Sequence, residues 1–218
     1  MIAQSPIPSS PLAGLNEPLR KGRHSKFLQI LDTSRRLFLD QGYDASSMDA
    51  IAREAGVSKA TLYAHFESKE ALFAVLIEEE CRAITDRIWP ADVDPIDVEG
   101  TLRRVAENIA TVFLDQHGLA IHRVIIAQGG KFPELGQIFW EAGPQTLNRR
   151  LGGFLREAAA RGLLDVPDPE LAAIQFLSLV RGDLPLQSVL SFRSLQAEAS
   201  RLVEGAVRLF MAGYAKGR

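Results

Sequence analysis

Residues 58–69 carry side chains whose types and spacing suit nucleic-acid binding, and they follow a glycine suited to a tight turn. Gly56 can supply that turn, and Ser58 can cap a helix on which Leu62 and Phe66 point inward at i, i+4 spacing. The outer face of this helix is then formed by small and polar residues, namely Lys59, Ala60, Thr61, Tyr63 and Ala64. Lysine reaches guanine or phosphate, threonine offers a hydroxyl or a methyl group to a base, and alanine permits close approach. The segment therefore predicts a helix that enters the major groove of DNA.

The rest of the chain lacks the spacings that catalysis or metal binding needs. His117 and His122 are five residues apart, so they do not share a helix face as an i, i+4 metal pair would. HExxH, GxSxG and Walker-loop motifs are absent from the sequence, and Gly129-Gly130 is too short to cradle a phosphate. We therefore expect no enzyme activity, no metal site and no cofactor.

The composition is that of an ordinary globular protein. The chain has 218 residues, of which 46% are hydrophobic and 24% charged. Its longest apolar run falls far short of the roughly 20 residues that a membrane span requires, and its first residues do not resemble a secretory signal. The single cysteine, Cys81, fits a reducing compartment and is more typical of a small buried side chain than of an oxidant sensor. We expect a cytoplasmic protein.

Charge is unevenly divided along the chain. Residues 1–66 hold eight basic and six acidic side chains, whereas residues 67–218 hold seventeen and twenty-one. A mildly basic front and an acidic body are compatible with nucleic acid meeting only the front.

Apolar residues recur with the period of an α-helix along most of the chain, and we find neither alternating strands nor an internal repeat, so the predicted fold class is all-α. Gly42, Gly56 and Pro90 end the first helices, and Gly143-Pro144 should kink a later one. The predicted helices cover residues 27–41, 48–55, 59–66, 68–89, 98–113, 117–128, 134–161, 171–180 and 195–213.

The N-terminal segment is expected to differ from the helical remainder. Residues 1–22 contain several prolines and serines and read as a disordered leader that ends in a basic arm. Arg20, Lys21 and Arg23 have no acidic neighbour between Glu17 and Asp32, so we expect them to lie along the DNA backbone or to reach the minor groove. A solvated tail that does not touch DNA is an equally weighted alternative.

The segment from Phe38 to Phe73 resembles the DNA-binding domain of the TetR family of transcriptional regulators. A dense string of positions carries the resemblance: Phe38, Gly42-Tyr43, Ser47, Ile51-Ala52, Ala55-Gly56-Val57-Ser58, Leu62-Tyr63, Phe66 and Lys69-Glu70. Residues 119–144 resemble the C-terminal domain of the AefR-like branch of that family. The resemblance implies a three-helix helix-turn-helix domain over residues 23–67 and a helical ligand-binding and dimerisation domain over residues 68–218.

The family resemblance also implies roles for individual residues. Tyr63 and Lys69 match positions that contact phosphates, and Ser47 matches one that often does so near the start of its helix. The backbone amides at the starts of the helices that Ser47 and Ser58 cap suit the same anions. Only one strong base-reading cation, Lys59, lies on the recognition helix, so operator shape should contribute to specificity.

The expected function is that of a homodimeric repressor that a small, largely apolar ligand releases from operator DNA. Dimers read two half-sites about 34–36 Å apart. The family resemblance implies that the last two helices, roughly 171–190 and 195–214, form a four-helix dimer interface. Candidate ligand-binding residues lie among the apolar side chains of the middle helices: Phe113, His122, Ile125, Phe139, Trp140 and Phe176. A tilt of the helix over residues 68–89 should couple ligand to DNA. The alternatives are an activator and an all-α carrier or enzyme that binds an apolar small molecule without DNA.

Overall fold

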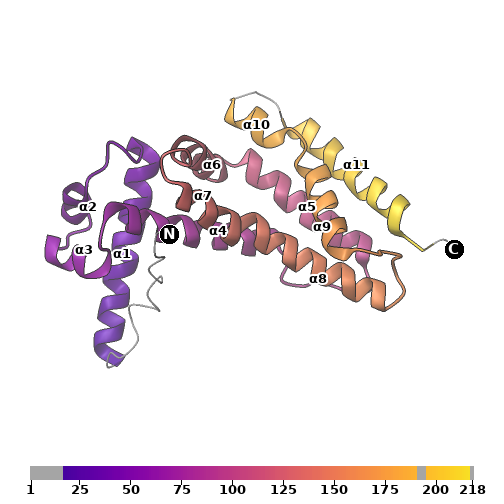
Figure 1. Ribbon diagram of the computed structural model, residues 1–218, viewed down its shortest axis with the longest axis horizontal. Helices are drawn as coiled ribbons and strands as arrows, with labels where there is room; N and C mark the ends of the chain where they lie inside the picture. The colour runs from indigo at the N-terminus through magenta and orange to yellow at the C-terminus, as the bar shows by residue number, and fades with distance from the viewer. Residues whose placement is uncertain (1–16, 191–194, 217–218) are drawn as a thin grey trace, which may run out of the picture. The chain divides into compact units, whose positions relative to one another are not determined.

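The computed structural model describes residues 17–190 and 195–216, and within these ranges the chain forms helices and no β-strand (Figure 1). The all-α prediction is therefore confirmed. In chain order the elements are α1 (Glu17–Gln41), α2 (Met48–Glu54), α3 (Lys59–His65), α4 (Lys69–Ile88), α5 (Val98–Leu114), α6 (Gln116–Gln128), α7 (Pro133–Trp140), the π-helix η1 (Glu141–Gln145), α8 (Thr146–Ala160), α9 (Pro169–Arg181), α10 (Leu184–Val189) and α11 (Gln196–Tyr214).

The chain divides into two compact units, residues 1–76 and 77–218. The division falls inside α4, so that helix contributes its first turns to the N-terminal unit and its remainder to the C-terminal unit. None of the described helices combines the length and the apolar character needed to cross a membrane.

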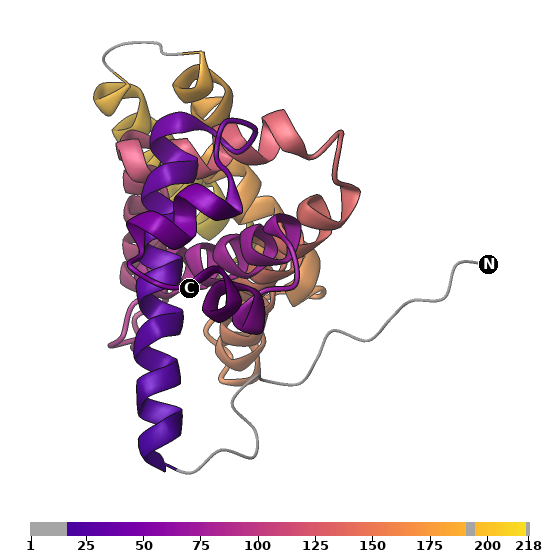
Figure 2. The ribbon, with the colours of Figure 1, turned by 90° about the vertical axis from the view of Figure 1, so that its left-hand side faces the viewer.

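In the N-terminal unit, α2 packs against α1 and α3 packs against α2 (Figure 2). Leu62 and Phe66 are buried, as their i, i+4 spacing predicts, and they hold α3 to this core. An aromatic cluster lies beneath the start of α4, where the ring centroids of Phe38, Tyr43 and Phe73 are 4.7–5.6 Å apart. Edge and tilted ring contacts of this kind fix the mutual orientation of α1 and the first turns of α4.

The turn between α2 and α3 depends on the left-handed backbone of Gly56, whose φ is 60°. The amide of Gly56 donates to the carbonyl of Arg53 at 3.2 Å, and the amide of Val57 donates to the carbonyl of Ala52 at 3.0 Å. These two bonds make a Schellman motif, which satisfies carbonyls that the end of α2 would otherwise leave unpaired. The motif sets the direction in which α3 leaves α2.

Helix α1 begins at Glu17, ten residues before the start that its apolar stripe predicted. Pro18 explains part of the difference, because a proline near a helix start lacks only an amide that would be unpaired there anyway. Arg20, Lys21 and Arg23 therefore have helical backbone and do not form an extended arm. The leader was expected to be disordered over residues 1–22, but residues 17–22 are helical. Residues 1–16 and the side chains of these three basic residues lie outside the described part of the structure.

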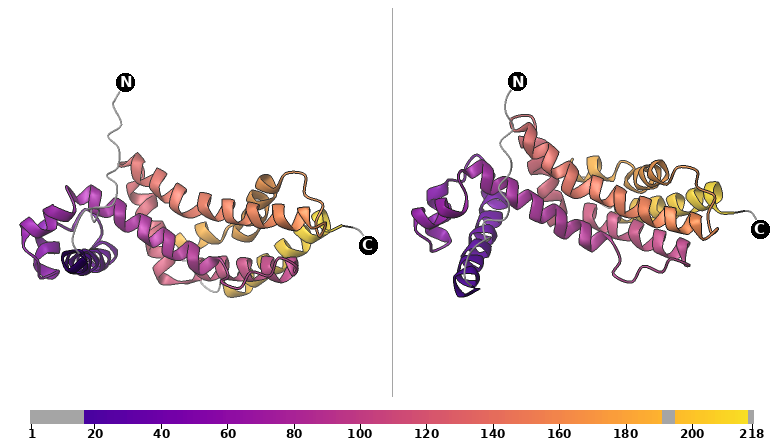
Figure 3. Two further views of the ribbon diagram at one scale, coloured as in Figure 1. Left: turned by 90° about the horizontal axis from the view of Figure 1, so that it is seen from below. Right: turned by 60° about the horizontal axis from the view of Figure 1, so that its bottom comes forward.

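The C-terminal unit is a bundle in which α8 packs on α9 and α11 packs on both α5 and α9 (Figure 3). Each of these helices buries one apolar stripe in a shared core. The ring of Phe176 on α9 meets the ring of Phe210 on α11 edge to face, with centroids 5.2 Å apart. Gly182, whose φ is 45°, ends α9 close to the end of the helix predicted over residues 171–180, and the short α10 follows it.

The kink expected at Gly143-Pro144 takes the form of η1, a single π-helical segment between α7 and α8. Pro144 has no amide to donate, and the wider π turn accommodates it without breaking the helix. The hydroxyl of Thr146 donates to the carbonyl of Glu141 at 2.8 Å, which satisfies one carbonyl of the disturbed turn. The hydroxyl of Thr85 on α4 lies 3.4 Å from the carbonyl of Ala142 in the same turn.

We expect Gly56→Ala to destabilise the α2–α3 pair by about 1–2 kcal/mol, because an alanine Cβ is disfavoured at positive φ. Gly56→Asn should cost less, since asparagine adopts this conformation more readily. Hydrogen exchange of the α2 and α3 amides measures both effects. Equal protection in the wild-type protein and Gly56→Ala would contradict this account of the turn.

Candidate nucleic-acid interface and ligand cavity

Helix α3 presents the face that its sequence predicts. Lys59, Ala60 and Ala64 are exposed, and the side chain of Tyr63 retains 49% of its accessible surface. Thr61 is half-buried at one edge of this face. The structure thus brings the predicted recognition residues together on one exposed surface, while Leu62 lies on the opposite, buried side.

Two serines begin the helices of this motif, as predicted. The hydroxyl oxygen of Ser47 accepts a hydrogen bond from the amide of Ala50 at 3.1 Å. The hydroxyl oxygen of Ser58 accepts from the amide of Thr61 at 3.0 Å, and the two hydroxyls of Ser58 and Thr61 are 2.8 Å apart. The Thr61 hydroxyl is therefore already hydrogen-bonded to Ser58. Its methyl group could contact a base without breaking that bond.

Lys59 makes an ion pair within the motif. Its ammonium nitrogen lies 2.6 Å from a carboxylate oxygen of Asp49 on α2, and both side chains are exposed. Such exposed pairs contribute about 0–1 kcal/mol, so exchanging Asp49 for a DNA phosphate or a guanine requires little energy. The same pair lowers the net positive charge that α3 presents.

The position of Lys69 depends on Tyr43, a residue to which the sequence analysis gave no role of its own. The Lys69 ammonium lies 4.1 Å from the centre of the Tyr43 ring, in a cation–π contact. The Tyr43 hydroxyl donates to Glu70 at 3.0 Å. Tyr43 therefore contacts both Lys69 and Glu70 at the start of α4. Its place beside Gly42 in the family pattern was the sequence signal that could have pointed to this role.

The protonation states of this contact are fixed by its surroundings. Burial, followed by the bond to Glu70, raises the pKa of Tyr43. Hydrogen bonds from the Glu70 amide and from Ser68, followed by that from Tyr43, lower the pKa of Glu70. At neutral pH the Tyr43 hydroxyl is thus a donor and Glu70 is an acceptor.

A separate cavity of about 280 Å³ lies within the C-terminal unit. Helices α4 to α10 and η1 contribute to its wall, which is mainly apolar. Phe113, His122, Phe139 and Trp140, predicted as ligand-binding residues, all line it. The His122 ring is flanked edge to face by the rings of Phe113 and Phe139, with centroid distances of 5.3 and 5.4 Å.

The other two predicted ligand residues do not line this cavity. Phe176 is fully buried in the core against Phe210, because its position on α9 faces α11. Ile125 is half-buried on α6, one turn beyond His122, and is not part of the wall. Helical period identifies a buried side chain without distinguishing a wall of the cavity from solid core.

Polar residues in the cavity wall were missed by the sequence analysis. Arg181 at the end of α9 and Asn148 in α8 both line it, as does Thr85 on α4. Leu177 and Arg181 are four residues apart and share the wall. A basic residue that continues an apolar stripe was therefore the sequence signal that could have identified Arg181 as a residue of the cavity wall. Cys81 also lines the cavity, and burial, followed by the nearby Glu80 and Glu78 carboxylates, raises the pKa of its thiol to about 12. The thiol is therefore protonated and unreactive at neutral pH.

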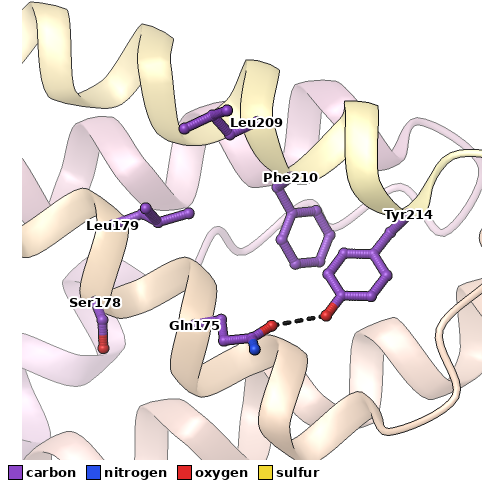
Figure 4. Close-up of a pocket in the computed structure, with 6 residues that line it drawn as sticks. All are labelled: Gln175, Ser178, Leu179, Leu209, Phe210 and Tyr214. Atoms are coloured by element: carbon purple, nitrogen blue, oxygen red, sulfur yellow. Dashed lines mark hydrogen bonds between the residues drawn. The ribbon is translucent and has the colours of Figure 1, made fainter.

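A shallow apolar groove follows the line where α9 and α11 meet (Figure 4). Leu179, Leu209 and Phe210 provide its apolar surface, and the hydroxyl of Tyr214 donates to the side-chain carbonyl of Gln175 at 2.7 Å across it. Four further large apolar residues on α9, on α10 and directly after α10 are 45–60% exposed, namely Leu171, Ile174, Leu186 and Leu190.

Family models match both parts of the chain. Residues 30–76 match the model for bacterial regulatory proteins of the tetR family. Residues 100–216 match the model for the C-terminal domain of AefR-like transcriptional repressors, so the expected branch of the family is found as well.

Known proteins show the same relationship over nearly the whole chain. The flavonoid-responsive regulator FrrA is 42% identical, with a TM-score of 0.78 over 89% of this chain and 100% of that one. A TetR-family regulator from Mesorhizobium loti is 28% identical, with a TM-score of 0.74 over 88% and 98%. A curated HTH-type transcriptional regulator of Mycobacterium tuberculosis is 37% identical over 90 residues, which cover 38% of this chain and 45% of that protein. The chain thus spans less than half the length of this relative. The present chain belongs to the TetR family of transcriptional regulators and carries that family's helix-turn-helix DNA-binding domain.

Proposed function

We propose that the chain is a homodimeric repressor that leaves its operator when a small, largely apolar ligand fills the cavity of the C-terminal unit. The observation that carries the proposal is that α4 runs without a break from Lys69 to the wall of the cavity. This one continuous helix begins with Lys69 and, three turns later, lines the cavity with Cys81, Ile84, Thr85 and Ile88. A ligand that shifts the later turns acts on the helix that holds Lys69.

The proposed DNA contacts divide into positioning and reading residues. Tyr63, Lys69 and Ser47 would meet phosphates, which fix register without reading sequence. Thr61 and Ala60 would approach base edges, and Lys59 would exchange its carboxylate partner for guanine or phosphate. Ser58 would hold the start of α3, and Arg20, Lys21 and Arg23 would add contacts with the DNA backbone.

The proposed partner for the groove between α9 and α11 is a second copy of this chain. Two half-sites need two recognition helices, and this groove exposes the apolar side chains of Leu179 and Leu209. A two-fold axis through the groove would bury Leu179 and Leu209 of both copies and produce a four-helix interface.

The cavity supports an aromatic effector. Its wall contains the rings of Phe113, His122, Phe139 and Trp140, which suit a flat apolar molecule. FrrA, at 42% identity, is described as responsive to flavonoids, which are aromatic compounds. The ligand releases DNA only if it binds the non-DNA conformation better, and a tenfold loss of operator affinity needs about 1.4 kcal/mol of such preference.

We expect Lys69→Ala and Tyr63→Phe to weaken binding to all DNA sequences alike, because both side chains are proposed to meet phosphates. Thr61→Ala should instead change base preference by about 1–3 kcal/mol. Selection of bound genomic fragments, followed by gel-shift titration at several salt concentrations, measures both. An unchanged salt slope in Lys69→Ala would overturn its phosphate role, and the absence of any sequence-dependent shift would favour a carrier.

We expect Leu209→Asp to convert the dimer to a monomer and to reduce operator affinity, because it places two charges in one apolar interface. Ile96→Asp is the matched control, since Ile96 is 69% exposed in the segment before α5 and away from the groove residues. Sedimentation velocity gives the oligomeric state. A dimeric Leu209→Asp variant would place the interface elsewhere.

We expect a flavonoid to lower operator affinity and to raise the melting temperature of the wild-type protein together. Trp140→Ala should weaken this response and leave operator binding unchanged when no ligand is present, because Trp140 lines the cavity and is half exposed. Normal induction in Trp140→Ala, His122→Ala and Phe113→Ala alike would show that the effector binds outside this cavity.

A further inference from the structure

We infer that the natural ligand of the cavity is a small aromatic acid whose carboxylate pairs with Arg181 and whose hydroxyl group donates to Asn148. This inference rests on the proposed function, since it adds a carboxylate and a hydroxyl group to the largely apolar aromatic body proposed for the effector.

The first observation is a charge without a counter-ion. Arg181 lines the cavity, and its Nε donates to the carbonyl of Leu177 in its own helix at 3.1 Å. Arginine has five N–H donors, and its Nη1 and Nη2 atoms donate to none of the described residues. Burial lowers the pKa of the guanidinium, and no described carboxylate raises it again. The group stays protonated at neutral pH, so its lost hydration is not replaced by an anion of this chain.

The end of the helix compensates this charge only in part. Arg181 lies in the last turn of α9, where unpaired carbonyls carry roughly half a negative charge. A carboxylate supplies a full charge and two oxygens in the geometry of the guanidinium fork. Carboxylate is therefore the ligand group that best completes this part of the wall.

The second observation is an unpaired acceptor. The side-chain Oδ1 of Asn148 is buried and has no hydrogen-bond partner, although Asn148 lines the same cavity. A buried carbonyl without a donor costs about 1–3 kcal/mol. A ligand hydroxyl would supply the missing donor, while the apolar body of the ligand contacts the aromatic side chains of the wall.

A matched pair of probes tests the charge. We would titrate the full-length protein with 6-hydroxy-2-naphthoate and with its neutral carboxamide, using calorimetry at neutral pH without DNA. The acid should bind at least tenfold more tightly than the amide, which corresponds to about 1.4 kcal/mol. Arg181→Gln should lower acid affinity to the level of the amide and leave amide affinity unchanged. Arg149→Gln, which removes an exposed arginine of α8, is the control and should bind both probes like the wild-type protein.

Further variants make each outcome decisive. Asn148→Leu should weaken binding of 6-hydroxy-2-naphthoate but not of 2-naphthoate, which lacks the hydroxyl group. If Arg181→Gln binds neither probe, Arg181→Lys decides, since a retained preference for the acid supports the inference and its loss overturns it. Equal wild-type affinity for acid and amide, or no binding of either up to about 1 mM, also overturns the inference. A separate gel-shift assay measures operator release. Failure of the proposed function would appear in that assay, whereas failure of this inference would appear in the calorimetric titrations.

Discussion

Helix α4 must bury one apolar stripe in two different cores, and the rest of the molecule depends on this constraint. Leu72 and Phe73 are buried in the N-terminal unit, whereas Cys81 and Ile88 are buried in the C-terminal unit. The far end of the helix is held by Asn108, whose side-chain amide donates to the carbonyl of Ile88 at 3.0 Å. A packed helix moves as a rigid element between discrete arrangements and does not bend gradually. In the proposed mechanism, a ligand that changes the packing of Cys81 and Ile88 would therefore act on the same helix that carries Leu72 and Phe73.

The wall of the cavity includes part of a π-helical turn and two polar side chains with unmet interactions. The π-helical turn around Pro144 is stabilised by side-chain hydroxyls, among them those of Thr146 and Thr85. In the same wall, the Arg181 guanidinium has no carboxylate partner among the described residues, and the Asn148 Oδ1 atom has no hydrogen-bond donor. A ligand that satisfies them gains energy that a purely apolar ligand does not. The inferred ligand would therefore combine groups that pair with Arg181 and Asn148 and an apolar body that contacts the aromatic side chains of the wall.

Local signals made much of this structure predictable. Gly56 and the capping serines mark the helix-turn-helix because positive φ and unpaired amides demand these residue types. The start of α1 was missed because its first ten residues lack an apolar stripe. Among the predicted ligand residues, Phe113 lines the cavity and Phe176 does not, since period indicates burial and the location of empty space depends on how several helices meet. Arg181 shows the reverse case, in which a charged residue on an apolar stripe faces the cavity.

The exposed face of α3 has little positive charge with which to read a DNA sequence. This bears on how the proposed ligand could release the operator. Lys59 already shares its charge with Asp49, and the Thr61 hydroxyl is already bonded to Ser58. In the proposed complex, phosphate contacts and the deformability of the operator would then supply much of the discrimination. Contacts of this kind depend on both halves of a dimer fitting one DNA shape at the same time. In the proposed mechanism, a shift of α4 that spoils this fit would weaken every such contact together, so a modest coupling energy at the cavity would suffice to release the operator.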